Sequence, residues 1–188
     1  MSENSVIEGV DYGPLALLVG HWEGDKGLDI APEPDGKEEN PYFETIFFEA
    51  IGNVTNAESQ TLSVLRYHQV VSRKSDDKVF HNETGYWMWD SGTGIVMHSL
   101  TIPRGVCLLA GGNATVGKAT ALDVSASLDS KEWGIVQSPF MQEKARTTKF
   151  DHNITVEGDK LSYSETTVLE IYGKTFDHTD SNVLNRCK

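Results

Sequence analysis

The sequence predicts an all-β protein: a single antiparallel up-and-down β-barrel of about ten strands with a short N-terminal helix. Three observations lead to this prediction. Apolar residues recur with a period of two in several segments, short turn sequences separate these segments, and almost no stretch has the 3.6-residue period of a helix. Consecutive antiparallel strands form a meander, and a sheet of this size closes most simply into a barrel.

The length and composition are those of one globular domain. The chain has 188 residues, of which 38% are hydrophobic. We place the domain at residues 13–188, after a flexible N-terminal segment of residues 1–12. The one stretch that looks helical is 13–18, where Pro14 stands in the first turn. We expect this helix to plug one end of the barrel.

The strands are expected to follow one another along the rest of the chain. The first surrounds Trp22 and the last closes the barrel near the C-terminus. Runs rich in aromatic and β-branched residues lie between them, at 42–51, 60–71, 79–89, 94–101 and 105–110.

Strict alternation gives the clearest strands. From 122 to 128, every second residue is apolar and the others are polar. The same period recurs over 150–156 and from Leu161 onward, with Gly158 and Asp159 between them. These two residues favour a hairpin turn, so the two segments are expected to pair.

Two polar or irregular stretches are expected outside the strands. The acidic, proline-containing run 31–40 is interpreted as a solvated loop. The stretch 129–142 is either a long loop or a flap that covers the barrel.

Residues 112–119 are close in sequence to a phosphate-binding loop. However, Ala119 lacks the required hydroxyl and a strand follows, so a hairpin turn is the better interpretation.

Charge and cysteine content exclude several classes of function. There are 16 Lys and Arg residues against 28 Asp and Glu, a formal net charge of −12, which disfavours nucleic acid and anionic membranes as partners. No run approaches the roughly 18 apolar residues of a membrane span. The polar first residues lack a secretory signal, and Cys107 and Cys187 are too few for a disulfide framework. We therefore expect a cytoplasmic protein, and leave a homodimer open.

Two histidines share faces with apolar residues of predicted strands. His152 alternates with Phe150 and Ile154, and His68 is on the face of Val64. Each is expected to point inward, either lining a cavity or hydrogen bonded in the wall. A barrel of this size can enclose a small molecule, so ligand binding is the default function.

Four motifs resemble the nitrobindin-like family, which is similar to fatty-acid-binding and lipocalin-like proteins. Residues 17–27 resemble its Gly-x-Trp-x-Gly-x-Gly opening, and 80–87 resemble its His-x-Glu-x-Gly-Tyr/Phe-Trp strand. Residues 99–112 are similar to the following strand pair, and 157–163 to its penultimate hairpin. The motifs occur in the family's order and span nearly the whole chain.

The resemblance implies a ten-stranded barrel that binds heme b, with ferric iron held by one histidine near the C-terminus. It further implies isomerisation of peroxynitrite to nitrate, or binding of nitric oxide. By position, the axial iron ligand is His178, with Asp177 or Asp180 as partner of its other ring nitrogen. The segments similar to the family's heme-facing ones also contain three further cofactor-binding candidates, His21, Lys26 and Met97.

The sequence departs from the family pattern in two places. Lys26 occupies the place of the third glycine of the opening motif, so that either Gly27 serves one residue late or the close approach of the backbone to the ligand is lost. The residues after His178 are polar, where family tails continue with leucine. The opening also resembles lipocalin-like proteins, which implies that Arg186 stacks over Trp22 at the closed end.

Two other functions remain open beside heme binding. One is a non-enzymatic carrier of an apolar or aromatic small molecule, with His178 only at the rim of the cavity. The other is a barrel enzyme of different chemistry, such as decarboxylation of a phenolic acid, that uses an inward histidine or glutamate as acid or base.

Overall fold

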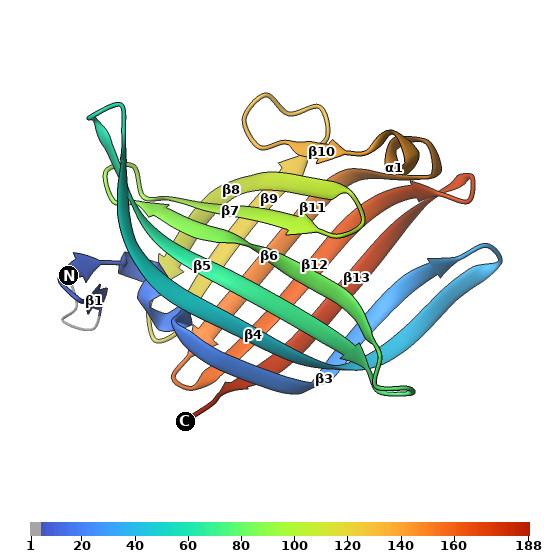
Figure 1. Cartoon of the computed structure of the whole chain (residues 1–188), viewed down its shortest axis with the longest axis horizontal. Helices are drawn as coiled ribbons and strands as arrows, with labels where there is room; N and C mark the ends of the chain where they lie inside the picture. The colour runs from blue at the N-terminus through green and yellow to red at the C-terminus, as the bar shows by residue number, and fades with distance from the viewer. Residues whose placement is uncertain (1–4) are drawn as a thin grey trace.

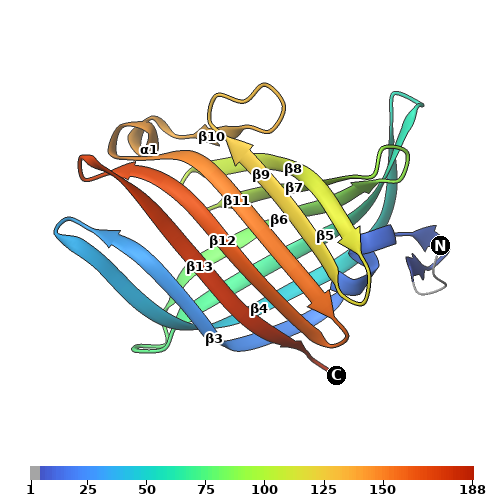
Figure 2. The ribbon, with the colours of Figure 1, turned by 180° about the vertical axis from the view of Figure 1, so that it is seen from behind.

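The computed structural model describes residues 5–188 and shows a closed antiparallel barrel (Figures 1 and 2). Each strand pairs with its neighbour in the barrel, and β8 pairs with β9 to close it. The predicted fold class and the predicted strand number are thus confirmed. The ten barrel strands are β3 (Gly20–Glu33), β4 (Gly36–Asn56), β5 (Gln60–Arg73), β6 (Val79–Asp90), β7 (Ile95–Ile102), β8 (Val106–Val116), β9 (Thr120–Ser127), β11 (Ala145–Glu157), β12 (Lys160–Ile171) and β13 (Lys174–Arg186).

Alternating side chains fill the barrel because every second residue of a strand faces inward. In β9, Leu122, Val124 and Ala126 are buried and the residues between them are partly or fully exposed. The β11–β12 hairpin turns at Gly158, whose φ of 60° is a left-handed conformation that glycine adopts readily. Residues 112–119, which are close in sequence to a phosphate-binding loop, lie in the β8–β9 hairpin, as predicted.

One end of the barrel is closed by the 3-10 helix Gly13–Leu18, at the position predicted for the helix. Leu15 and Leu18 are fully buried, and Trp22 Nε1 donates a hydrogen bond to the Leu18 carbonyl oxygen at 2.6 Å. The Arg186 guanidinium lies 4.1 Å from the centre of the Trp22 ring, a cation–π contact that confirms the expected closure. Any sizeable cavity must therefore lie toward the other end.

The N-terminal segment packs against this closed end. Residues 1–4 lie outside the described residues, but β1 (Val6–Ile7) and β2 (Val10–Asp11) form a small two-stranded sheet. Tyr12 is buried in the core, and its hydroxyl accepts a hydrogen bond from the backbone N–H of Gly52 at 2.7 Å. Residues 5–12 are thus tied to the barrel by specific contacts.

The prediction of a loop at residues 31–40 is wrong. The ends of β3 and β4 extend into a two-stranded ribbon, in which Ala31 pairs with Glu38 and only Pro34 and Asp35 form the turn. Solvation of the run was predicted correctly, because most of its side chains are exposed. A solvated ribbon needs no apolar face, so its sequence lacks the alternation that identifies a half-buried strand.

The stretch 129–142 is the covering flap rather than a long loop. It contains β10 (Ile135–Gln137), which pairs with β8 outside the ring, and the first turn of the short helix α1 (Pro139–Lys144). Ser138 caps the helix by accepting a hydrogen bond from the Met141 N–H. The side chain of Met141 faces the barrel interior at the open end.

The inward prediction is confirmed for His152 and wrong for His68. His152 is 8% exposed and packs among aromatic rings, including those of Phe150 and Tyr163. His68 is exposed and lies within 3.1 Å of the Asn82 side-chain oxygen on the outer surface. Both faces of β5 are buried near its start, so the burial of Val64 does not identify the inner face there.

A glycine on β6 provides a sharp test of the barrel's strand packing. A Cβ atom built at Gly85 would lie 1.9 Å from the Ser99 carbonyl oxygen on β7, so Gly85→Ala must push the two strands apart. We expect a loss of about 1–3 kcal/mol of unfolding free energy, measured by urea denaturation. Gly36→Ala, which meets no atom within 4 Å, is the matched control. Equal stability of Gly85→Ala and Gly36→Ala would contradict the close packing of β6 against β7 at Gly85.

Candidate ligand cavity

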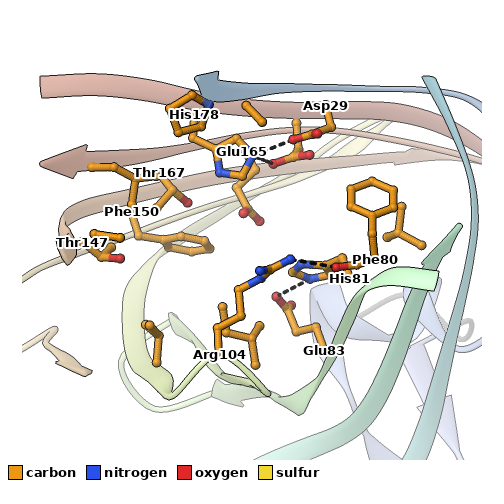
Figure 3. Close-up of a pocket in the computed structure, with 18 of the residues that line it drawn as sticks. Asp29, Phe80, His81, Glu83, Arg104, Thr147, Phe150, Glu165, Thr167 and His178 are labelled. Carbon is orange, nitrogen blue, oxygen red and sulfur yellow. Dashed lines mark hydrogen bonds and ion pairs between the residues drawn. The ribbon is translucent and has the colours of Figure 1, made fainter. Parts of the chain in front are cut away.

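The open end of the barrel contains a cavity of about 340 Å³ (Figure 3). This size is within the range of small-molecule sites, and the cavity opens to solvent on one side. Much of its lining is apolar. The apolar lining includes Val71, Phe80, Leu100, Ile102, Val106, Leu108, Phe150, Leu169 and Ile171.

His178 lies in this cavity, on β13, and is held by carboxylates. Its Nε2 atom is 2.6 Å from Asp29 Oδ1 and 3.5 Å from Asp180 Oδ2. Asn40 donates a hydrogen bond to the other Asp29 oxygen at 2.9 Å and so orients this carboxylate. Burial lowers the pKa of His178, but the hydrogen bond to Asp29 and the charge of Asp180 outweigh burial and raise the pKa above its ordinary value.

A second polar group lies across the cavity, on β6 and the β7–β8 turn (Figure 3). His81 Nε2 is 3.3 Å from Glu83, and Arg104 donates a hydrogen bond to the Phe80 carbonyl oxygen at 2.9 Å. Nearby, the buried Nε of Arg73 has no hydrogen-bond partner among the described residues. The cavity thus carries imidazole and guanidinium groups on the wall that faces His178.

The inner end of the cavity is formed by a hydrogen-bond network around Glu44. Glu44 accepts hydrogen bonds from Gln69 and Asn182, both at 2.6 Å, and from the Tyr163 hydroxyl at 3.0 Å. The Tyr163 hydroxyl is also 2.6 Å from that of Tyr42. Burial raises the pKa of Glu44 to about 7, although these hydrogen bonds act to lower it.

The raised pKa of Glu44 gives a pH dependence with a defined sign. The folded state holds this proton up to about pH 7, whereas an ordinary glutamate loses it near 4.5, so the unfolding free energy should fall as pH rises between these values. Urea denaturation across this range should show a shallower slope for Glu44→Gln than for wild type. The matched control is Glu132→Gln, at an exposed position. An unchanged slope in Glu44→Gln would contradict the assignment.

Of the predicted cofactor contacts, the structure places only His178 in the cavity. His21 is exposed and stacks on Phe47 at a ring distance of 4.2 Å, and Lys26 is also exposed. Met97 lies on the outer face, because its neighbours Val96 and His98 both point inward and are fully buried. None of the other three candidates is among the lining residues.

A β-bulge accounts for the altered glycine motif. The register of β3 against β4 shifts between Gly24 and Gly27, and Lys26 is one of the residues in between. A Cβ atom at Gly27 would lie 2.0 Å from the Tyr42 ring. Gly27 thus allows a close approach one residue late, and the group that approaches its backbone is the Tyr42 ring, which is part of the cavity wall.

Several cavity residues were missed from the sequence. Counting every second residue from the inward Tyr163 would have found Glu165. The same count from Trp22 finds Asp29 only if the bulge in β3 is taken into account. The partner expected for His178 was Asp177 or Asp180. Asp180 is confirmed as a neighbour, whereas Asp177 is exposed on the outer face, and the shortest contact is with Asp29.

The fold and cavity define a ligand-binding β-barrel that carries a carboxylate-supported histidine in its open end. Residues 11–186 match the family model of the THAP4-like, heme-binding beta-barrel domain, and the chain belongs to this family. The resemblance seen in the sequence is thus confirmed. Among solved structures, that of Rv2717c from M. tuberculosis is similar, with a TM-score of 0.70 and 26% identity over 93% of this chain and 95% of that one.

No curated protein matches the chain. Among residues 5–188, no helix is both long and apolar enough to cross a membrane.

The lining fits the heme that the family implies. Its apolar wall suits a flat macrocycle, and a cavity open on one side allows part of the group to extend outward. The unpaired Nε of Arg73 suits a carboxylate of the cofactor. His178 would hold the iron, and its contacts with Asp29 and Asp180 would orient the imidazole.

Proposed function

We propose that this protein binds ferric heme b in the cavity, with His178 as the axial ligand. The observation that carries the proposal is the His178 imidazole, which faces an apolar cavity while Asp29 holds its Nε2 atom. A carboxylate on the second ring nitrogen fixes the ring orientation and makes the ligating nitrogen more basic. Heme binding is also what membership of the family supports.

We further propose that the bound group serves nitric oxide binding or the isomerisation of peroxynitrite to nitrate. Heme would supply the iron at which these molecules bind. The chain's own contribution is to exclude water with its apolar wall and to offer donors to an anionic ligand from His81 and Arg104. The free Cys107 and Cys187 are consistent with the cytoplasm as the place of this activity.

The test is reconstitution with hemin followed by addition of nitric oxide and, separately, peroxynitrite. We expect a strong Soret band, a shift of this band with nitric oxide, and faster peroxynitrite decay with nitrate as product. A Soret shift without faster decay would restrict the function to nitric oxide binding. Absence of a Soret band would contradict heme binding altogether.

The size and apolar lining of the cavity also support a second candidate, a carrier of an apolar or aromatic small molecule. A fluorescent apolar probe separates the two functions. If heme is the ligand, hemin should displace the probe from the cavity. Tight probe binding that hemin does not affect would favour the carrier.

A further inference from the structure

A chain of hydrogen bonds runs from the wall of the ligand cavity into the barrel core. Glu83 lies 3.3 Å from His81 Nε2 at the cavity wall and accepts a hydrogen bond from the buried Tyr67 hydroxyl at 2.5 Å. His98 Nε2 lies 2.8 Å from the same hydroxyl. Because the single hydroxyl hydrogen of Tyr67 is directed at Glu83, the Tyr67 oxygen accepts its other bond from the Nε2–H of His98. Burial lowers the pKa of His98 to about 3 and keeps the ring neutral, so its Nδ1 carries no hydrogen.

The hydrogen-bond chain ends at imidazole nitrogens that have no partner in the protein. His98 Nδ1 is buried and has no hydrogen-bond partner among residues 5–188. The centre of the His152 ring is 5.5 Å from that of His98, and this ring is 8% exposed. Neither nitrogen of His152 has a hydrogen-bond partner among the same residues. Buried polar groups are nearly always hydrogen bonded, to protein or to ordered water, so these neighbouring nitrogens indicate a polar ligand that the chain itself does not supply.

A small second cavity reaches both imidazoles. It measures about 10 Å³, is lined by His98 and His152, and adjoins the ligand cavity, with which it shares Gln69, Glu83 and Tyr163. A space of this size holds about one water molecule, and buried water typically binds polar groups that would otherwise lack partners. The second cavity thus suits one water molecule that contacts both rings.

We propose that one water molecule binds in this second cavity, between His98 and His152, and completes a proton relay from Glu165 to His81. His152 lies directly opposite Glu165 on the paired strand, with its Nδ1 3.5 Å from a Glu165 oxygen. Glu165 on β12 and His81 on β6 both line the ligand cavity. The relay therefore starts and ends in the ligand cavity and passes through the core. Its order is Glu165, His152, water, His98, Tyr67, Glu83 and His81.

The two carboxyl groups of the relay differ in protonation. Burial and the charges of Glu83 and Asp180 raise the pKa of Glu165 well above its ordinary value, so Glu165 holds a proton at neutral pH. Burial acts in the same direction on Glu83, but the hydrogen bond and the charge of His81 outweigh burial and lower the pKa of Glu83. A proton can thus pass from Glu165 toward Glu83. Each group between them takes up one proton and releases one, so none gains or loses a proton overall.

The water site is tested by oxygen-17 magnetic relaxation dispersion on the full chain without added heme. This measurement counts water molecules that stay bound longer than the protein takes to tumble. We expect one such molecule fewer in His152→Phe than in wild type, because phenylalanine has no nitrogen to bind it. His68→Phe makes the same change at an exposed position and should keep the wild-type number. An equal number in folded His152→Phe and in wild type would overturn the proposal.

The tautomer of His98 is tested in the wild-type chain, so this test does not depend on the folding of a variant. Nitrogen-15 NMR of labelled histidine distinguishes the two ring nitrogens. We expect Nε2 to carry the hydrogen and Nδ1 to show the chemical shift of a hydrogen-bonded acceptor. A hydrogen on Nδ1, or an Nδ1 without a hydrogen bond, would overturn the proposal.

Proton transfer is tested by the exchange of the His98 Nε2–H with solvent. Glu83→Gln keeps an acceptor for Tyr67 but cannot take up its proton. Exchange should slow by about tenfold or more, because a positioned proton-transfer group typically speeds a transfer by about a hundredfold or more. A general loosening of the fold would instead make exchange faster. The matched control Glu132→Gln, at an exposed position, should exchange as wild type does. Unchanged or faster exchange in folded Glu83→Gln would overturn the relay.

This inference goes beyond heme binding, because the bound water and the exchange are both measured without heme. A hemin titration of wild type separates the two proposals. A Soret band together with a failed water or exchange test would overturn the relay and leave heme binding intact. The expected water and exchange results without a Soret band would support the relay and remove heme binding.

Discussion

Replacing His178 with alanine is expected to weaken heme binding and to change the spectrum of any heme that still binds. His178 is the imidazole that faces the cavity from β13, and among the described residues the cavity has one other, His81, which is paired with Glu83. Removing the axial nitrogen leaves the apolar wall and the Arg73 guanidinium to hold the group, without a bond to the iron. In a hemin titration, the Soret band of His178→Ala should be lost or shifted, with affinity reduced by about tenfold or more.

His68→Ala is the matched control for this experiment. It removes the same side chain from an exposed position on the outer surface. Its Soret band and stoichiometry should equal those of wild type. A His178→Ala protein with the wild-type spectrum, or a His68→Ala protein with the same defect, would contradict the assignment of the axial ligand.

Replacing Trp22 with alanine should cause the largest loss of stability. The ring is fully buried, donates a hydrogen bond to Leu18 at 2.6 Å and lies under the Arg186 guanidinium at 4.1 Å. Its removal leaves a cavity beneath the 3-10 helix and frees a cation, so we expect a loss of about 3–5 kcal/mol of unfolding free energy. Equilibrium urea denaturation measures this change.

Phe140→Ala is the control for the loss of an aromatic ring. Phe140 is 69% exposed on α1, so its removal should change the unfolding free energy by less than about 0.5 kcal/mol. Arg186→Ala, which leaves the Trp22 ring in place, should fall between the two. A Trp22→Ala protein as stable as Phe140→Ala would contradict the account of the closed end.

The barrel could be predicted because strict alternation of apolar and polar residues shows which side of a strand faces inward. The β9 run from Leu122 and the β11–β12 hairpin at Gly158 each fix which face is buried and where the chain turns. The plug at Gly13–Leu18 was predicted from a proline in its first turn. In each case one short segment contains the physical reason for its own structure.

The errors in the fold come from segments in which alternation carries no information. Residues 33–39 are all exposed, so a strand there has the composition of a loop. At the start of β5 both faces are buried, and His68 was therefore assigned to the wrong face. Tertiary surroundings, rather than local sequence, determine burial at both places.

The site was predictable only in part, because its geometry depends on strand register. The resemblance to a family indicated His178, and the structure places it in the cavity. The contact with Asp29, which is 149 residues away in sequence, exists because β3 pairs with β13. Neither strand alone indicates that pairing, and the position of Glu165 opposite Asp180 depends on a third strand, β12.

His21, Lys26 and Met97 show the limit of transferring positions by resemblance. A segment can match in sequence while one residue of it faces outward, because neighbouring residues in a strand point to opposite faces. Met97 is adjacent to the buried His98, and Lys26 lies in the bulge before Gly27. A shift of a single residue thus separates a cavity position from a surface position.

A hemin titration that compares two single substitutions on β12 tests the central claim most directly. Thr167 lines the cavity directly opposite His178, and Thr166 is the next residue along the strand, outside the lining. Thr167→Trp should fill the cavity and prevent binding of one heme per chain while the imidazole remains, and Thr166→Trp should bind heme as wild type does. Equal heme binding by the two folded variants would show that heme, if bound, lies elsewhere.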